Sequence, residues 1–158
     1  MTNNEELVSV LNDLITINND RIEGYQKAQH DTDNVNVDLQ TMFKEMASQS
    51  MKYVQQLTQE VAALGGEATN DTSLSGKVHR AWIGIKTAVT GHERMTVLES
   101  CEFGEDAIQK AYETALESDA SMDTDIRQLI VSQQNDLKTS HDVVKNFRNV
   151  QEKIEEAS

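Results

Sequence analysis

The chain of 158 residues has no proline, one cysteine and seven glycines, and only 4% of its residues are aromatic. Without proline little interrupts a helix, because proline removes a backbone donor and clashes with the preceding turn. The shortage of aromatic residues disfavours a β-sandwich, whose strands use β-branched and aromatic side chains. These absences favour one all-α domain over residues 1–158, a length that can form its own core.

The single cysteine, Cys101, excludes an intramolecular disulfide and any CxxC motif. No apolar run approaches the roughly 20 residues that span a bilayer. The first residues, Met-Thr-Asn-Asn-Glu-Glu, are acidic and lack the apolar core of a signal peptide. We therefore expect a cytoplasmic protein outside the membrane, in which Cys101 is a buried, inert thiol rather than a nucleophile.

Basic residues are few: 14 lysines and arginines face 27 acidic residues, for a formal net charge of −13. Such a surface repels the phosphates of nucleic acids and of anionic membranes. We expect neither as a partner and interpret the charge mainly as a source of solubility. The sequence remains compatible with a homo-oligomer.

Apolar residues recur at steps of three and four along four long segments, which is the spacing of amphipathic helices. These segments cover residues 5–29, 35–64, 92–117 and 123–155. Thr2 and Glu5 have the spacing of a capping box for the first helix, and Gly65-Gly66 should end the second. Ser121 is expected to cap the last helix.

The connections predict the directions of these helices. Residues 30–34 and 118–121 are short polar turns, so the first two helices and the last two should each be antiparallel. The segment from residue 67 to residue 91 is long enough to cross over, so the middle two helices can run parallel. This up-down-down-up order with one crossover is that of a ferritin-like four-helix bundle.

The crossover should itself carry a short helix over residues 77–89. It is locally basic on an acidic protein, with Lys77, Arg80, Lys86 and Arg94. Apolar side chains follow for docking on the bundle: Trp82, Ile83, Ile85 and Val89. We expect a lid that covers part of the core or a dimer contact, and the alternative is a basic site for an anionic ligand.

Glu105 lies on the apolar stripe of the third long helix, where an ionised carboxylate is costly unless it is paired. Successive residues of a helix are turned by about 100° about its axis, and on this basis other polar residues also project inward. They are Asn18, Ser50, Gln133, Ser140 and His141. A contact of Glu105 with His141 is within side-chain reach, and Gln133 is a second candidate partner. This pattern predicts a buried polar layer.

A di-iron or di-manganese bundle needs two inward glutamates and two Glu-x-x-His motifs, and this chain has no Glu-x-x-His. One inward glutamate and one histidine cannot hold a binuclear centre. A mononuclear site of Glu105, Glu102 and His141 remains an alternative to a polar cluster satisfied within the protein. We expect no cofactor, and iron, manganese or zinc would be the metals to test.

Several short motifs together resemble the bacterial ferritin-like family known as domain of unknown function 2383. They are Leu11-Asn-Asp-Leu-Ile15, Gly24-Tyr25, Leu64-Gly65-Gly66, His79-Arg80-Ala-Trp82, Cys101-Glu102-Phe-Gly104-Glu105-Asp106, Ala111-Tyr112 and His141-Asp142. The resemblance extends from about Leu7 to Phe147 and implies a bacterial cytoplasmic four-helix bundle. It supplies no activity, because the family is functionally uncharacterised.

No catalytic triad, phosphate-binding loop or zinc motif is visible in the sequence. We therefore expect a non-enzymatic binding or assembly protein. The alternative is a metal-binding protein or metal-dependent oxidoreductase that lacks the full di-iron ligand set. A third class is a small-ligand binder that uses the seam under the crossover.

Overall fold

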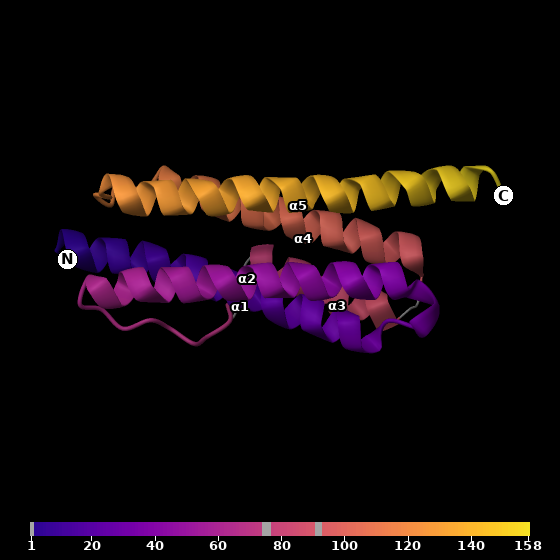
Figure 1. Ribbon diagram of the computed structural model, residues 1–158, viewed down its shortest axis with the longest axis horizontal. Coiled ribbons are helices and arrows are strands. Elements are labelled where there is room, and N and C mark those ends of the chain that lie inside the picture. Colours follow the sequence, from indigo (N-terminus) through magenta and orange to yellow (C-terminus); the bar gives the residue numbers. More distant parts are fainter. Residues whose placement is uncertain (1, 74–76, 91–92) are drawn as a thin grey trace.

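The computed structural model describes residues 2–73, 77–90 and 93–158, and this part of the chain contains helices and no strand (Figure 1). The prediction of an all-α protein is confirmed for these residues. The four long helices are α1 (Asn3–Asp31), α2 (Val37–Ala63), α4 (Arg94–Leu116) and α5 (Thr124–Glu156). The shorter α3 (Lys77–Thr90) precedes α4, and a 3-10 turn, η1 (Asn34–Asn36), precedes α2.

Local hydrogen bonds explain where the helices begin and end. The Thr2 hydroxyl accepts from the Glu5 amide at 3.1 Å and begins α1, and Gly65, with φ of 79°, ends α2 in the left-handed conformation. The prediction of Ser121 as the cap of α5 is wrong. Asp123 directly precedes that helix, and its carboxylate accepts from the Ile126 amide at 2.8 Å. Position 92, the predicted start of the next-to-last helix, lies outside the described residues.

The helices form two antiparallel pairs, α1 with α2 and α4 with α5, and α2 runs in the same direction as α4 (Figure 1). α3 packs against α1 and α4 and so covers the seam between the two pairs. Residues 64–73 lead back along α1 to α3. The side chain of Asn12 holds this loop by bonds to Glu67 and Thr69, and that of Asp20 by bonds to Ser73.

Trp82 anchors α3 to the rest of the molecule. Its indole is 2% exposed and lies against two glycines, Gly24 on α1 and Gly104 on α4. A Cβ atom at either glycine would come within 3.0 Å of the ring, so the absence of a side chain there admits the indole. The expectation that Ile83 docks is wrong, since it is 45% exposed. The side chains of Lys77, Lys86 and Val89 lie outside the described residues.

The other two basic residues of the crossover do not form an anion site together. Arg80 is exposed, and Arg94 pairs with Asp38 on α2, with its Nη2 atom 2.5 Å from the carboxylate. Because Arg94 is neutralised by an acidic side chain, it mainly ties the start of α4 to the start of α2.

The hydrophobic core consists of two clusters at opposite ends of the molecule. The cluster beside α3 includes Tyr25, Phe43, Trp82, Leu98 and Cys101. The cluster at the other end includes Leu11, Leu57, Ile108, Ile130 and Leu137. Along each long helix, buried polar side chains lie where one cluster gives way to the other: Asn18, Arg21, Ser50, Glu105 and Ser140. Gln133 is also buried, within the second cluster on α5.

The last turns of α5 are exposed. The apolar spacing along α5 continues to Ile154, yet this side chain is 55% exposed, because α5 extends past the neighbouring helices at its C-terminal end (Figure 1). No helix in the described residues is both long and apolar enough to span a bilayer.

Candidate functional site

The partner of Glu105 is Arg21, a residue that the sequence analysis did not select. The Arg21 guanidinium on α1 donates from Nε to one Glu105 oxygen at 2.9 Å and from Nη2 to the other at 2.7 Å. Both side chains are 0% exposed. The geometry is the bidentate one that a planar guanidinium and a carboxylate form best. The prediction that His141 is the partner of Glu105 is therefore wrong.

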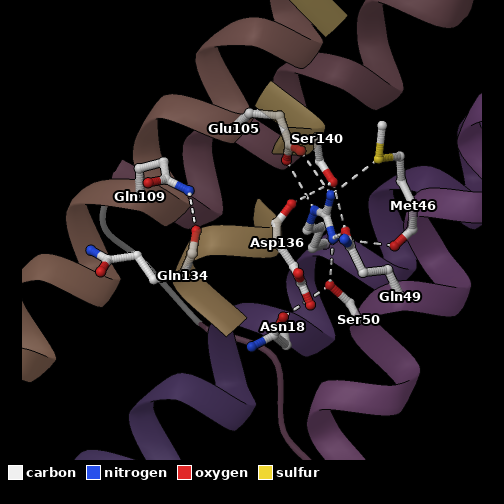
Figure 2. Close-up of polar contacts among 10 residues, drawn as sticks. Asn18, Met46, Gln49, Ser50, Glu105, Gln109, Gln134, Asp136 and Ser140 are labelled. Atoms are coloured by element: carbon white, nitrogen blue, oxygen red, sulfur yellow. Dashed lines mark hydrogen bonds and ion pairs between the residues drawn. The ribbon is translucent and has the colours of Figure 1, made fainter. Parts of the chain in front are cut away.

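The remaining N–H groups of Arg21 also have acceptors, all of them on α2. Nη1 donates to the Gln49 side-chain oxygen at 2.8 Å, the Ser50 hydroxyl at 2.9 Å and the Met46 carbonyl at 3.2 Å. Nη2 lies 3.3 Å from the Met46 sulfur. Figure 2 shows Glu105, Met46, Gln49 and Ser50 directed toward one centre from two different helices. The guanidinium is thus satisfied within the protein.

A chain of hydrogen bonds continues from this centre through the core. The Ser50 hydroxyl donates to the Asn18 carbonyl oxygen at 2.9 Å, and the Asn18 amide donates to the Tyr112 hydroxyl at 2.9 Å. Tyr112 donates to Gln133 at 2.7 Å, and the Gln133 amide donates to Gln56 at 3.1 Å. Gln133 therefore binds Tyr112 and Gln56 and does not cap Glu105, which corrects the second candidate partner.

The helix α5 joins the same network through Ser140, whose hydroxyl donates to the Gln49 side-chain oxygen at 2.9 Å (Figure 2). Every long helix thus contributes at least one side chain to one continuous set of bonds. We call this set the polar layer: Asn18, Arg21, Gln49, Ser50, Glu105, Tyr112, Gln133 and Ser140. Buried polar groups are stable only when paired in this manner.

Electrostatics keep Arg21 charged. Burial, the largest single effect, lowers the pKa of Arg21, but the charge of Glu105, the nearby Tyr25 and Tyr53 side chains and the hydrogen bond to Glu105 together raise the pKa overall. The guanidinium also lies over the Tyr25 ring, 5.3 Å from its centre, which is a favourable cation–π distance. Burial and the nearby Glu105 charge raise the pKa of Tyr25, so this phenol stays neutral and protonated at physiological pH.

His141 lies at the surface rather than in the polar layer. Its Nε2 atom is 2.6 Å from the Asp106 carboxylate, and its side chain is 21% exposed. The two residues help to line a groove of about 470 Å³ between α4 and α5, with Gln109, Glu113, Gln134, Asn135, Lys138 and Asp142. Both His141 and its neighbour Ser140 were expected on the inner face of α5. Only Ser140 is buried, so the prediction holds for Ser140 and is wrong for His141.

The three candidate metal ligands do not converge. Glu105 binds Arg21, His141 binds Asp106, and Glu102 lies 3.9 Å from Arg148. Among residues 2–73, 77–90 and 93–158, no three or more His, Cys, Asp or Glu side chains form a cluster that could hold a metal ion. The positive charge beside Glu105 comes from the chain itself.

The signal for Arg21 was present in the sequence. Leu14, Asn18, Arg21 and Tyr25 follow one another at steps of four, three and four, so Arg21 lies on the apolar stripe of α1. Arginine is almost never fully buried unless it is paired. The residue type thus suggested the surface, and only the position on the stripe suggested the core.

Cys101 is fully buried beside this layer, and we expect it to be unreactive in the folded protein. Burial, together with the charge of Glu105, raises the pKa of its thiol. The thiolate is the reactive form, and a reagent can reach Cys101 only when the core opens locally. We therefore expect a thiol reagent to label Cys101 at least about 100-fold more slowly in buffer than in denaturant. Rapid labelling of the native protein by Ellman's reagent would contradict this burial.

Comparison with known families agrees with the resemblance drawn from the motifs. The profile of a domain of unknown function, DUF2383, matches residues 6–118. The match contains α1 to α4 with Arg21 and Glu105, and it ends before α5. Searches of curated proteins and of solved structures gave no match. Since the match covers most of the sequence, from α1 to the end of α4, the chain belongs to the DUF2383 family.

Proposed function

We propose that this chain is a non-enzymatic binding or assembly protein built on a ferritin-like four-helix bundle. The observation that carries the proposal is the complete pairing of Arg21 with Glu105 and with α2. Ferritin-like metal proteins place cations between inward carboxylates at the centre of the bundle. Here a guanidinium supplies the positive charge at the corresponding level of the core.

The helix directions support the ferritin-like part of the proposal. Two antiparallel pairs joined so that α2 and α4 run parallel match an up-down-down-up order (Figure 1). The link between α2 and α4 contains α3 and spans the seam between the pairs. A simple up-and-down bundle with short turns would leave α2 and α4 antiparallel.

The chemistry of the polar layer supports a structural role for it. Arginine does not lose its proton in proteins, so Arg21 cannot act as an acid or a base. Both Glu105 oxygens already accept hydrogen bonds, and both side chains are 0% exposed. No substrate can reach this pair without opening the core. We propose that it sets the register of α1 against α2 and α4, so that surfaces between helices are held in place for binding.

A metal-loading experiment tests this proposal against the metal-dependent alternative. The purified protein is incubated with iron(II), manganese(II) or zinc(II), desalted and measured by elemental mass spectrometry. We expect less than about 0.1 metal ion per chain, because the candidate ligands are separated and their partners are supplied by the protein. Unfolding followed in parallel should show no stabilisation by metal.

Matched variants make the metal experiment decisive. His141→Ala and Glu102→Ala remove candidate ligands outside the Arg21 pair and should change neither metal content nor folding by a large amount. One metal ion per chain that is lost in both variants would overturn the proposal and support a metal-binding protein. Metal that persists in both variants would indicate nonspecific surface binding to an acidic chain.

A further inference from the structure

The seam between α1 and α4 is filled over only part of its length. Near one end, the indole of Trp82 lies in the seam against Gly24 and Gly104. α3 contacts both α1 and α4 there. Small residues on the two long helices thus make room for a large apolar side chain on a helix that lies across them.

The seam is also open two turns away, at a stretch that no segment of the described chain covers. Seven residues from Gly24 and from Gly104 lie Ile17 and Ala111, on the same faces of α1 and α4. They line a groove of about 270 Å³ together with Val10, Asp13, Leu14, Thr114, Ala115 and Ser118. We call it the α1–α4 groove. Its volume suits one or two large apolar side chains.

The groove carries a negative charge that lacks a partner. Asp13 is the one charged residue among the eight that line it. No ion pair or hydrogen bond to its carboxylate occurs within the described residues, and partial burial raises its pKa. A cation brought by a ligand would stabilise the ionised carboxylate. The surrounding protein, with a formal net charge of −13, also favours a basic ligand.

The chain itself shows what kind of ligand fits such a seam. α3 occupies the neighbouring stretch, and its sequence, Lys-Val-His-Arg-Ala-Trp-Ile-Gly-Ile-Lys-Thr-Ala-Val-Thr, contains three lysines or arginines and one tryptophan. We propose that the α1–α4 groove binds a basic amphipathic helix of a partner protein, which inserts one large apolar side chain between Ile17 and Ala111 and places a lysine or arginine beside Asp13. This mode of recognition is a helix in a groove, and the proposal names the partner for the binding role proposed above.

A labelled peptide with the sequence of residues 77–90 is the probe. Its fluorescence anisotropy is followed while the full-length protein is added at physiological ionic strength. We expect saturable binding of one peptide per chain. A scrambled peptide of the same composition keeps the charge but loses the apolar face, so it should bind at least tenfold more weakly.

Variants locate the binding site. Ala111→Glu fills the groove with a charged side chain and should weaken binding at least tenfold. Ala62→Glu makes the same change at an exposed position on α2 and should leave the affinity unchanged. Asp13→Asn should weaken binding by a smaller factor, about threefold to tenfold for one exposed charge. If circular dichroism shows that Ala111→Glu does not fold, Thr114→Lys takes its place. This substitution lies on the exposed rim of the groove and should also weaken binding.

Each outcome bears on the proposal separately from the metal experiment. Binding that survives both Ala111→Glu and Thr114→Lys would show that the peptide displaces α3 or binds elsewhere, and the proposal would be wrong. Absence of saturable binding to the wild-type protein, or equal binding of the scrambled peptide, would also overturn it. Neither result bears on the metal content, so a failure here would leave the outcome of the metal-loading experiment unaffected.

Discussion

Glu105→Ala is expected to lower the free energy of unfolding by about 3–5 kcal/mol, because it leaves the Arg21 guanidinium buried without its counter-charge. Both side chains are 0% exposed, so water cannot replace the lost carboxylate. Urea unfolding, followed by the helical signal in far-ultraviolet circular dichroism, measures the change in the free energy of unfolding. Glu105→Gln keeps one hydrogen-bond acceptor and should cost less than alanine.

Removing both charges separates the penalty of an unpaired charge from the net value of the pair. The double variant Arg21→Met with Glu105→Leu should be much more stable than either single variant, since buried ion pairs are often replaced by apolar residues at little or no net cost. A double-mutant cycle gives the coupling energy. If Glu105→Ala and the double variant were equally destabilised, the pair would not be coupled as the structure indicates.

Trp82→Ala is expected to lower the free energy of unfolding by about 3–5 kcal/mol, the range for truncating a buried tryptophan. The indole is 2% exposed and forms an edge contact with Tyr25, with ring centres 4.9 Å apart. Because this side chain anchors α3 to α1 and α4, its loss should also detach α3. Limited proteolysis should then cleave between α2 and α4 while the long helices remain folded.

Glycine variants provide a matched control for the Trp82 contact. Gly24→Ala would bring a Cβ atom to 2.9 Å from the indole and should destabilise the protein. Gly84→Ala lies on α3 itself, where a Cβ atom meets nothing within 4 Å. It should stabilise the protein by about 0.5–1 kcal/mol through higher helix propensity. Equal effects of the two substitutions would contradict the docking of α3 described above.

The bonds of Arg21 and Asn18 lie where the two apolar clusters meet. A shift of α1 along α2 by one turn would break these bonds and move both clusters out of alignment. Apolar side chains tolerate such shifts more readily than bidentate hydrogen bonds do. The layer therefore favours one register, and this register forms both the Trp82 seat and the α1–α4 groove.

The helices themselves could be predicted from the sequence for a simple reason. Apolar residues at steps of three and four, with Thr2 before the first helix and Gly65 after the second, are local signals that hardly depend on the rest of the chain. Burial of Asn18, Ser50, Glu105 and Gln133 could also be read from their positions on the stripes. Helix ends were less accurate, as Asp123 shows, because neighbouring polar residues compete for one cap.

Partners within the core could not be assigned in the same way. Glu105 has Arg21 rather than His141 opposite it, since contact depends on how α1, α4 and α5 rotate and slide against one another. A helical wheel shows the face on which each residue lies, but it does not show which residue of a neighbouring helix lies opposite. His141 and Ser140 differ by one position, and the packing of α5 on α4 decides which of them points inward.

The sequence alone thus determined an all-helical chain, the approximate extent of its helices and an inward carboxylate that required a partner. Only the tertiary structure decided that the partner of this carboxylate is an arginine 84 positions earlier in the chain. It also decided that Trp82 lies between two glycines and that a groove remains open beside Ile17 and Ala111. Periodicity is a property of each segment by itself. Pairing across segments depends on the distance and rotation between helices, which are set by the packing of the whole core.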